Sequence, residues 1–298
     1  MAARSRVYFV VACALTPMVI FALAAALLLA EQQRENTERE ARARARAAMS
    51  AVDAHLRGAV VSLGTLAASK NLESGDIAAF HRESQRVLST QPAWENIGLA
   101  SAARTQLSNA VEPFAKPQPL TPDDESFATV LRGARAAFSD VMAGIAVRTP
   151  TVRVRIPVTY GEEVRYVISA PLNLRHLAAL LEAQRLPEDW AIGLVDRRKQ
   201  VVVRIPATPA GTPVSAELSA AIGRSAEGWV RDQSADGRAT YTAYVTSALS
   251  GWVLGISIPA ETVEAGERRT YTIIGVGFAV ALAAGLLFAW LAAKDLSG

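Results

Sequence analysis

Two long apolar runs without a charged residue bracket this sequence, one from Val7 to Ala30 and the other from Tyr271 to Ala293. A helix needs about 20 such residues to cross the hydrocarbon core of a bilayer. A cleaved signal peptide is the alternative for the first run. Its apolar stretch, however, exceeds the usual h-region of about 7–15 residues. We therefore expect two transmembrane helices, 7–30 and 271–293.

Basic residues near the runs predict the orientation of the chain. Arg4 and Arg6 precede the first run and Lys294 follows the second, which favours both ends in the cytoplasm, whereas Arg268 and Arg269 argue the other way. We expect 1–6 and 294–298 in the cytoplasm and 31–270 in the periplasm, in a two-pass protein of the bacterial inner membrane. The segment 31–270 is then close to neutral, so the net charge of +3 gives no support to nucleic-acid binding.

The segment 31–70 is predicted to be one long helix. It lacks proline, and its Glu residues at 35, 38 and 40 each precede an Arg by four positions, the favoured order on a helix. Apolar residues then recur at alternating spacings of three and four, at Met49, Val52, Leu56, Ala59, Leu63 and Leu66. Such a heptad seam can join two copies of the protein or pack on a sheet of the same chain. We expect packing on the chain's own sheet at the far end and pairing near the membrane.

Short strings that recur in the same order indicate an internal duplication. Ile97–Leu99 returns as Ile192–Leu194, and a base follows seven residues after each Ile, at Arg104 and Lys199. The two units also end alike, at Pro171 and Pro259. Matching start, turn and end predict two related units, 71–185 and 186–259.

Each unit is expected to run strand, tight turn, strand, helix and three strands, which makes the fold class α+β. In the first unit we expect strands at 96–100, 105–110, 137–142, 151–158 and 164–170, a helix from Thr121 and a second helix capped by Asn173. In the second unit we expect strands at 190–196, 201–204, 228–231, 239–245 and 252–258, a helix at 214–223, and a connecting helix at 260–270.

The chain resembles the double Cache sensor module of bacterial receptors, most closely that of sensor histidine kinases. The resemblance rests on short strings in a fixed order, at Phe127–Arg132, Phe138–Asp140, Arg155–Val158, Leu186–Trp190, Val195–Asp196, Gly251–Val253 and Pro259. It covers about 31–270 and implies a long helix packed on two tandem PAS-like units with antiparallel sheets, flanked by two transmembrane helices. The amino-acid-binding subgroup carries Tyr, Arg-x-Trp-Tyr and Asp, and this pattern is missing here.

The resemblance implies a ligand site in the membrane-distal unit, 71–185. The strand 151–158 alternates valines and isoleucine with Arg153 and Arg155, so the two arginines share one face. A guanidinium suits a carboxylate or phosphate, although both arginines could instead lie on a solvated face. The candidate ligand-binding residues are Arg132, Ser139, Asp140, Arg153, Arg155 and Tyr166.

Enzymatic activity has no support in the sequence. It contains no His-Glu-x-x-His, Gly-x-Ser-x-Gly or P-loop pattern. One cysteine and three scattered histidines, expected on helix surfaces, predict no metal site and no cofactor. Catalytic residues are therefore not expected.

The predicted function is that of a transmembrane signal-transduction receptor. A small solute, possibly a carboxylate, would bind the distal unit of a homodimer and pass a conformational signal through the second span to a histidine kinase or another output module. Only a ligand with different affinity for two states can do this. The alternatives are a membrane-anchored dimeric scaffold that binds a partner protein and, less favoured, an anchored extracytoplasmic hydrolase.

Overall fold

The computed structural model describes residues 2–115, 117–119, 125–143, 150–234 and 236–265, together with 275–277, 279–280 and 283. The chain divides into two compact parts, one of residues 41–258 and the other of residues 1–40 and 259–298. We call residues 41–258 the body. The second predicted span and the expected start of a helix at Thr121 fall largely outside the described residues.

The predicted long helix is present as α1, Ala2–Ala67, which ends shortly before the short helix α2, Lys70–Glu73. Its residues 7–30 are helical, but within the described part of the chain no helix meets the combined length and apolarity that a bilayer crossing demands. Both transmembrane spans therefore remain predictions. Residues 260–265 are helical, as expected for the start of the connecting helix.

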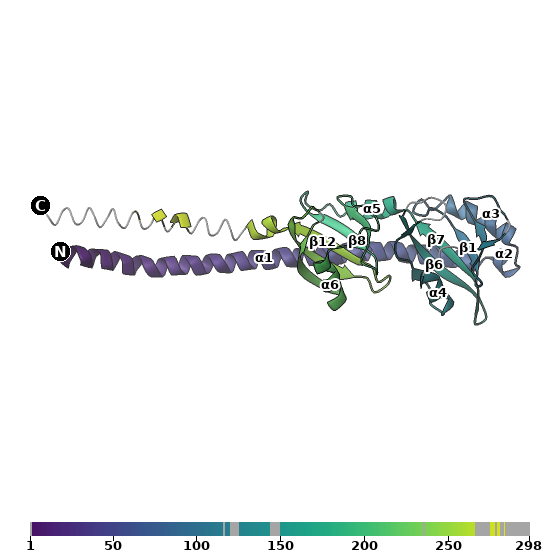
Figure 1. Cartoon of the computed structure of the whole chain (residues 1–298), viewed down its shortest axis with the longest axis horizontal. Coiled ribbons are helices and arrows are strands. Elements are labelled where there is room, and N and C mark those ends of the chain that lie inside the picture. The colour runs from purple at the N-terminus through teal and green to yellow at the C-terminus, as the bar shows by residue number, and fades with distance from the viewer. Residues whose placement is uncertain are drawn as a thin grey trace. The chain divides into compact units, whose positions relative to one another are not determined.

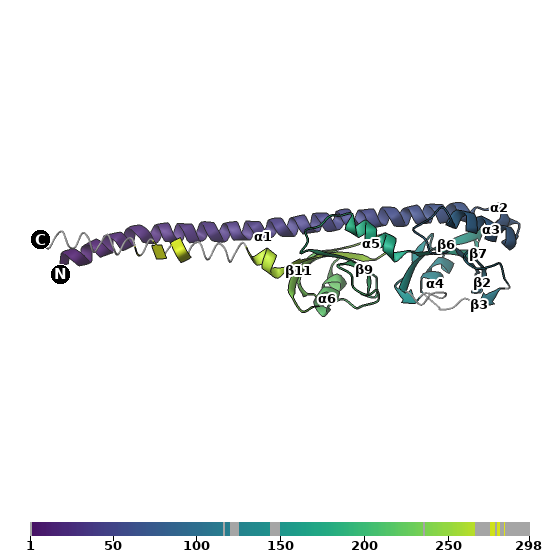
Figure 2. The ribbon, with the colours of Figure 1, turned by 90° about the horizontal axis from the view of Figure 1, so that it is seen from above.

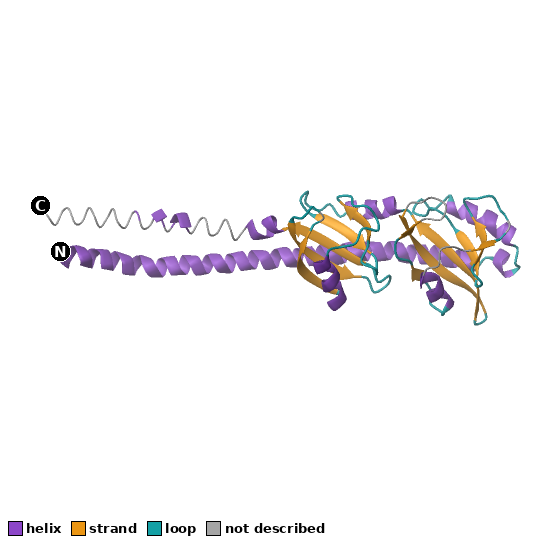
Figure 3. Cartoon of the chain, viewed as in Figure 1, coloured by secondary structure: helices purple, strands orange, loops and turns teal. Residues whose placement is uncertain are grey.

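Two antiparallel sheets form the body (Figures 1 and 3). The first unit consists of α3 Ile77–Leu88, β1 Gly98–Ser101, β2 Thr105–Asn109, β3 Gln118–Pro119, α4 Glu125–Leu131, β4 Ala137–Phe138, β5 Met142–Ala143, β6 Pro150–Tyr160 and β7 Glu163–Leu172. After α5, Leu174–Glu182, the second unit consists of β8 Ala191–Val195, β9 Val201–Ile205, α6 Ala216–Arg224, β10 Glu227–Gln233, β11 Ala239–Thr246 and β12 Val253–Pro259. The side chains of Asn173 and Ser215 cap α5 and α6.

The two sheets share one order of strands, which agrees with the predicted internal duplication. Five strands of the first sheet run β2-β1-β7-β6-β4, and the second sheet runs β9-β8-β12-β11-β10. When these five strands of each unit are numbered along the chain, leaving out the two-residue strands β3 and β5, both sheets have the order second, first, fifth, fourth, third. The basic residues in the two turns also match in conformation, since Arg104 and Lys199 have φ angles of 64° and 66°. Both therefore occupy the left-handed region that glycine favours.

The heptad seam of α1 packs on its own chain. All six seam residues, from Met49 to Leu66, are buried within the single chain. In the body, α1 runs along one face of the sheets, while α4 and α6 lie on the other (Figure 2). Side-chain contacts also join α1 to the second unit, because Arg46 forms an ion pair with Glu227 at 2.8 Å and Ser247 donates to Asp53 at 2.6 Å. The own-sheet reading of the seam is therefore confirmed, and the pairing of two copies stays a prediction.

The expectation that all three histidines lie on helix surfaces is wrong for His81. This residue is buried, and its Nδ1 lies 2.9 Å from Ser108 Oγ of β2. α3 packs on β2 at this point, so one face of the helix becomes core. His55 of α1 and His176 of α5 are partly exposed, with ring centroids 5.0 Å apart.

Acid is expected to destabilise the body through His55. Burial, and secondarily the charge of His176, lower the pKa of His55 below its usual 6.5. The unfolded chain then binds more protons than the folded one as pH falls. The stability that this group contributes is therefore complete above the ordinary histidine pKa and is lost as pH falls through the depressed value. Urea unfolding at several pH values between about 5 and 8 should show this slope, and His55→Gln should flatten it. An unchanged slope in the variant would contradict the assignment.

Candidate functional site

The two faces of the first sheet are both buried, but by different elements. On β6 and β7 the pairing places Val154 opposite Ala170 on the face toward α1, and Arg155 opposite Ser169 on the face toward α4. Arg153 and Arg155 are only 6% and 2% exposed. The solvated-face alternative for the arginines is therefore wrong. The reason is that α4 covers their face of the sheet, with Phe127 packed against Ala100 and Val167.

Arg155 is held between α4 and the sheet. Its Nε donates to Ser126 Oγ of α4 at 2.9 Å, and its Nη1 donates to Ser169 Oγ of β7 at 2.7 Å. The guanidinium carbon lies 5.3 Å from the centre of the Phe127 ring, and that of Arg104 lies at the same distance. A cation over an aromatic ring is stabilised by the ring quadrupole. Two guanidinium groups from different elements therefore converge on one aromatic side chain.

Arg153 lies two residues along the same face. Its Nη1 lies 2.9 Å from Met142 Sδ of β5. Its charge also reaches Glu95: burial raises the pKa of the Glu95 carboxyl, and Arg153 partly opposes that rise. This face of the sheet thus holds two buried guanidinium groups, Arg153 and Arg155, and a guanidinium is a group that suits a carboxylate or phosphate.

Ser139 and Asp140 belong to the connection after β4. The Ser139 hydroxyl accepts from the backbone N–H of Arg153 at 2.9 Å and donates to the carbonyl of Asp140, so it extends the pairing of β4 with β6. The Asp140 carboxylate accepts from Arg197 Nε at 3.0 Å and lies 3.6 Å from Arg198 Nε, both in the second unit. Asp140 therefore ties the two units together, through Arg197 and Arg198 of the second unit.

A buried carboxylate lies next to this tie. Asp196, after β8, is fully buried and accepts from the backbone N–H groups of Val141 at 2.9 Å and Gln200 at 2.8 Å. Burial raises the pKa of Asp196, the two hydrogen bonds oppose the rise, and the charge of Asp140 adds to it. Asp196 belongs to one of the strings on which the double Cache resemblance rests, but the sequence predicted no structural or binding role for it.

Two further predicted residues lie elsewhere. Arg132 is exposed in the turn just after α4 and donates to Thr129 Oγ1 of that helix at 3.1 Å. Tyr166 is buried opposite Val158, on the α1 side of the first sheet, so it cannot line a pocket with Arg153 and Arg155. Adjacent strand residues point to opposite faces, and this pairing register fixes Tyr166 on the valine face.

Ser126, Ser169 and Phe127 belong to the arginine cluster but are not predicted by the sequence pattern. Two of them stand inside strings that the sequence singled out, Phe127 in the string up to Arg132 and Ser169 in the unit end at Pro171. The missing information was the strand register that places Ser169 across from Arg155. Among the described residues, no group of three or more His, Cys, Asp or Glu side chains is arranged to hold a metal ion.

Solved structures share this architecture. The extracellular domain of rpHK1S-Z16, a protein assigned as a histidine kinase, matches with a TM-score of 0.62 at 15% identity, over 77% of this chain and 97% of that one. The ligand-binding domain of the Pseudomonas fluorescens chemoreceptor CtaA, in complex with L-isoleucine, matches at 0.59 and 14%, over 79% and 97%. That of the Pseudomonas aeruginosa PAO1 amino acid chemoreceptor PctB, in complex with L-Arg, matches at 0.55 and 13%, over 76% and 97%.

This chain has the double Cache fold. The matches cover 97% of each of these solved domains and more than three quarters of this chain. The predicted double Cache resemblance is thereby confirmed at the level of the fold. No protein-family model matches the sequence, and no curated protein matches it. Within the double Cache fold, the arginine cluster occupies the first of the two units.

Proposed function

We propose that this chain is the sensing part of a transmembrane receptor, and that its first unit binds a small anionic solute at the arginine cluster. The observation that carries the proposal is the burial of Arg155 between Ser126 of α4 and Ser169 of β7. A ligand carboxylate that competes for the guanidinium would alter the contact between α4 and the sheet. Sensory domains of the same fold bind small molecules, which supports this reading.

The topology, the pairing of two copies and the output belong to the same proposal. We propose that residues 31–270 lie in the periplasm between the two predicted spans, that two chains pair near the membrane, and that the second span passes the signal to a histidine kinase or another cytoplasmic module. The long helix α1, which continues from the predicted first span into the body, supports a mechanical link of this kind. We propose a sensor rather than an enzyme because the domains of the same fold are sensory.

Thermal unfolding of the purified chain with a panel of mono- and dicarboxylates tests the ligand proposal. A carboxylate that binds the folded state should raise the unfolding temperature, because at about 100 times its Kd it adds about 2.7 kcal/mol of stability. Arg155→Gln should abolish the shift, since it removes the charged fork. Arg132→Gln is the matched control and should retain the shift, because Arg132 is exposed in the turn after α4. The absence of any shift across the panel, or its survival in Arg155→Gln, would refute the assignment of the site.

A further inference from the structure

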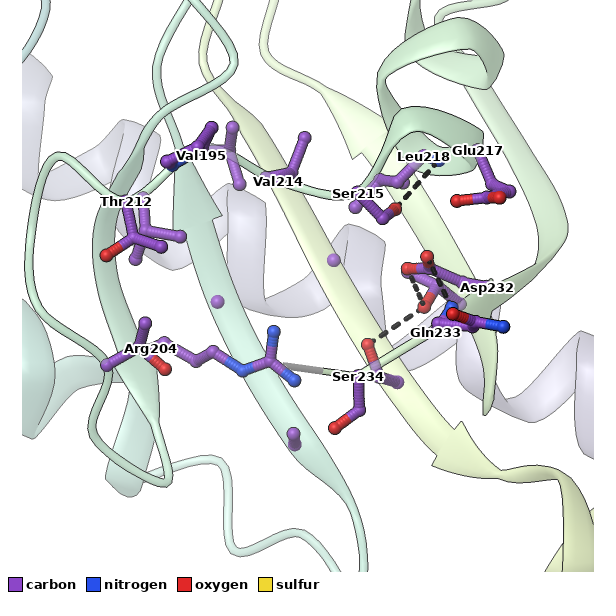
Figure 4. A pocket seen from close by; sticks show the side chains of 18 of the residues that line it. Val195, Arg204, Thr212, Val214, Ser215, Glu217, Leu218, Asp232, Gln233 and Ser234 are labelled. Carbon is purple, nitrogen blue, oxygen red and sulfur yellow. Dashed lines mark hydrogen bonds between the residues drawn. The ribbon is translucent and has the colours of Figure 1, made fainter. Parts of the chain in front are cut away.

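The second unit contains a cavity of about 470 Å³ that the sequence did not predict (Figure 4). It lies over the second sheet, beside the first turn of α6 and the segment that leads into that helix. This volume falls within the range of about 300–1,000 Å³ that is typical of small-molecule sites. The cavity is separate from the arginine cluster, since its lining residues all come from 191–257.

The cavity exists because the floor of the sheet carries almost no side-chain volume. Gly193 of β8 lies directly opposite Gly255 of β12, and Ala191 lies opposite Ser257. The next row of the same face carries Val195 and Val253, which pack with α6 in a hydrophobic cluster that includes Leu218, Ala221 and Tyr244. The face is thus filled at one end and hollow at the other.

Opposite charges stand at the two sides of this hollow. Arg204 lies on β9, at one edge of the sheet, and its guanidinium points into the cavity, toward the side formed by Asp232 and Ser234 (Figure 4). Asp232 lies on β10, the other edge strand. Throughout the described part of the chain, no hydrogen bond or ion pair engages the Arg204 side chain. A lining arginine without a protein partner can accept an anionic group.

Asp232 has acceptor capacity left on its carboxylate. It is 8% exposed and accepts from the backbone N–H of Gln233 at 2.7 Å and from Thr242 Oγ1 at 3.3 Å. A carboxylate offers about four lone-pair sites, so these two donors do not saturate it. Thr242 also lies 2.8 Å from Ser257 Oγ, which makes this side of the floor polar. A buried carboxylate of this kind favours a cationic or N–H donor group.

The charges select the class of ligand. A dianion would satisfy Arg204 but would place its second charge against Asp232, and a simple amine would place its charge against Arg204. A small zwitterion can place its anionic group at Arg204 and its cationic group at Asp232. The paired glycines Gly193 and Gly255 in the floor leave room for the atoms between these two groups. We propose that the second unit holds a separate binding site for a small zwitterionic solute, with its anionic group on Arg204 and its ammonium on Asp232.

Calorimetric titration of the 298-residue chain tests this proposal. The probes are glycine, β-alanine and 4-aminobutyrate, which separate the two charges by increasing lengths, with acetate and methylammonium as singly charged controls. At least one zwitterion should bind, and acetate and methylammonium should bind at least about tenfold more weakly, because each meets one end of the site. Arg204→Gln and Asp232→Asn should each weaken the zwitterion at least about tenfold, through the loss of a charge-assisted contact.

Gly255→Val provides a steric test. A Cβ at Gly255 would meet Thr242 Cγ2 at 3.4 Å, an ordinary contact, so the valine should fit the fold while its methyl groups fill the cavity. We expect loss of zwitterion binding in this variant and retention in Gly223→Ala, since a Cβ at Gly223 meets nothing within 4 Å. Thermal unfolding without a probe verifies that each variant is folded. If Gly255→Val does not fold, Asp232→Asn replaces it as the test, because it keeps the size of the side chain.

Three outcomes would overturn the proposal: no probe binds, the zwitterion binds Gly255→Val as well as the original chain, or charge-removing changes at Arg204 and Asp232 leave its affinity unaltered. Loss of zwitterion binding in Arg155→Gln with full binding in the Arg204 and Asp232 variants would place the zwitterion in the first unit and would also overturn it. None of these outcomes bears on carboxylate binding at the arginine cluster, which is assigned by its loss in Arg155→Gln.

Discussion

Replacement of Trp252 with alanine is expected to lower the free energy of unfolding by about 3–5 kcal/mol, the usual cost of truncating a fully buried aromatic side chain. Trp252 is completely buried just before β12, and its ring meets that of Phe138 edge-on, with centroids 6.3 Å apart. Phe138 belongs to β4 of the first unit. The truncation would therefore open a cavity at a contact between the two units, where neither sheet can close it alone.

Urea unfolding followed by circular dichroism measures this loss, and Trp252→Phe is its matched control. In the described part of the chain the buried indole N–H of Trp252 has no hydrogen-bond partner. Phenylalanine keeps a ring against Phe138 and removes this unsatisfied donor, whose burial costs about 1–3 kcal/mol. The phenylalanine variant should consequently lose much less stability than the alanine variant. Equal losses in the two variants would show that the ring contact is not the source of the effect.

Replacement of Asp196 with alanine is the second large effect, with an expected loss of about 2–5 kcal/mol. The change leaves the backbone N–H groups of Val141 and Gln200 without their acceptor, and each unsatisfied buried group costs about 1–3 kcal/mol. Asp196→Asn retains one carbonyl oxygen, so it should lose less. Denaturant unfolding at constant pH measures both, and an alanine variant as stable as the asparagine variant would contradict the role of the two N–H groups.

The same carboxyl gives a pH signature with a defined sign. Burial raises the pKa of Asp196 in the folded chain above its ordinary value of 3.8. The folded state then binds the proton more readily than the unfolded state. The stability that protonation contributes is complete below the ordinary pKa and is lost as pH rises through the raised one. The Asn variant lacks this titration, so its deficit relative to the original chain should shrink as pH rises through that window. A deficit that grows with pH instead would reverse the assignment.

The alternation along β6 predicted which residues share a face, because side chains on a strand have a period of two. It could not predict that both faces are buried, since this depends on α1 and α4 packing from opposite sides. The register of β6 against β7 could not be predicted either. The pairing of β6 with β7 shifts between Val158 and Thr159, and no local pattern marks that irregularity. For this reason the sequence predicted Tyr166 beside the arginines, whereas the structure places Ser169 there and Tyr166 on the opposite face.

The other differences between the predicted and the observed site arise from contacts between residues that are far apart in the sequence. Asp140 was expected to bind a ligand, and its carboxylate instead pairs with Arg197, 57 residues away. The repeated strings at Ile97 and Ile192 predicted two related units, but Gly98 lies opposite Ser169, whereas Gly193 lies opposite Gly255. Identical motifs thus entered different registers, and only the second unit gained a row of paired glycines. The cavity over that row could not be inferred from either string alone.

The buried carboxylate between the two units has a consequence for how the body melts. Val141 belongs to the first unit and the Asp196 turn to the second, so either unit that unfolded by itself would lose this buried hydrogen bond and expose the packed surface around it. Partial denaturation with one sheet intact is thereby disfavoured. The two halves of a duplicated fold, which could in principle have remained independent, are made into a single cooperative block.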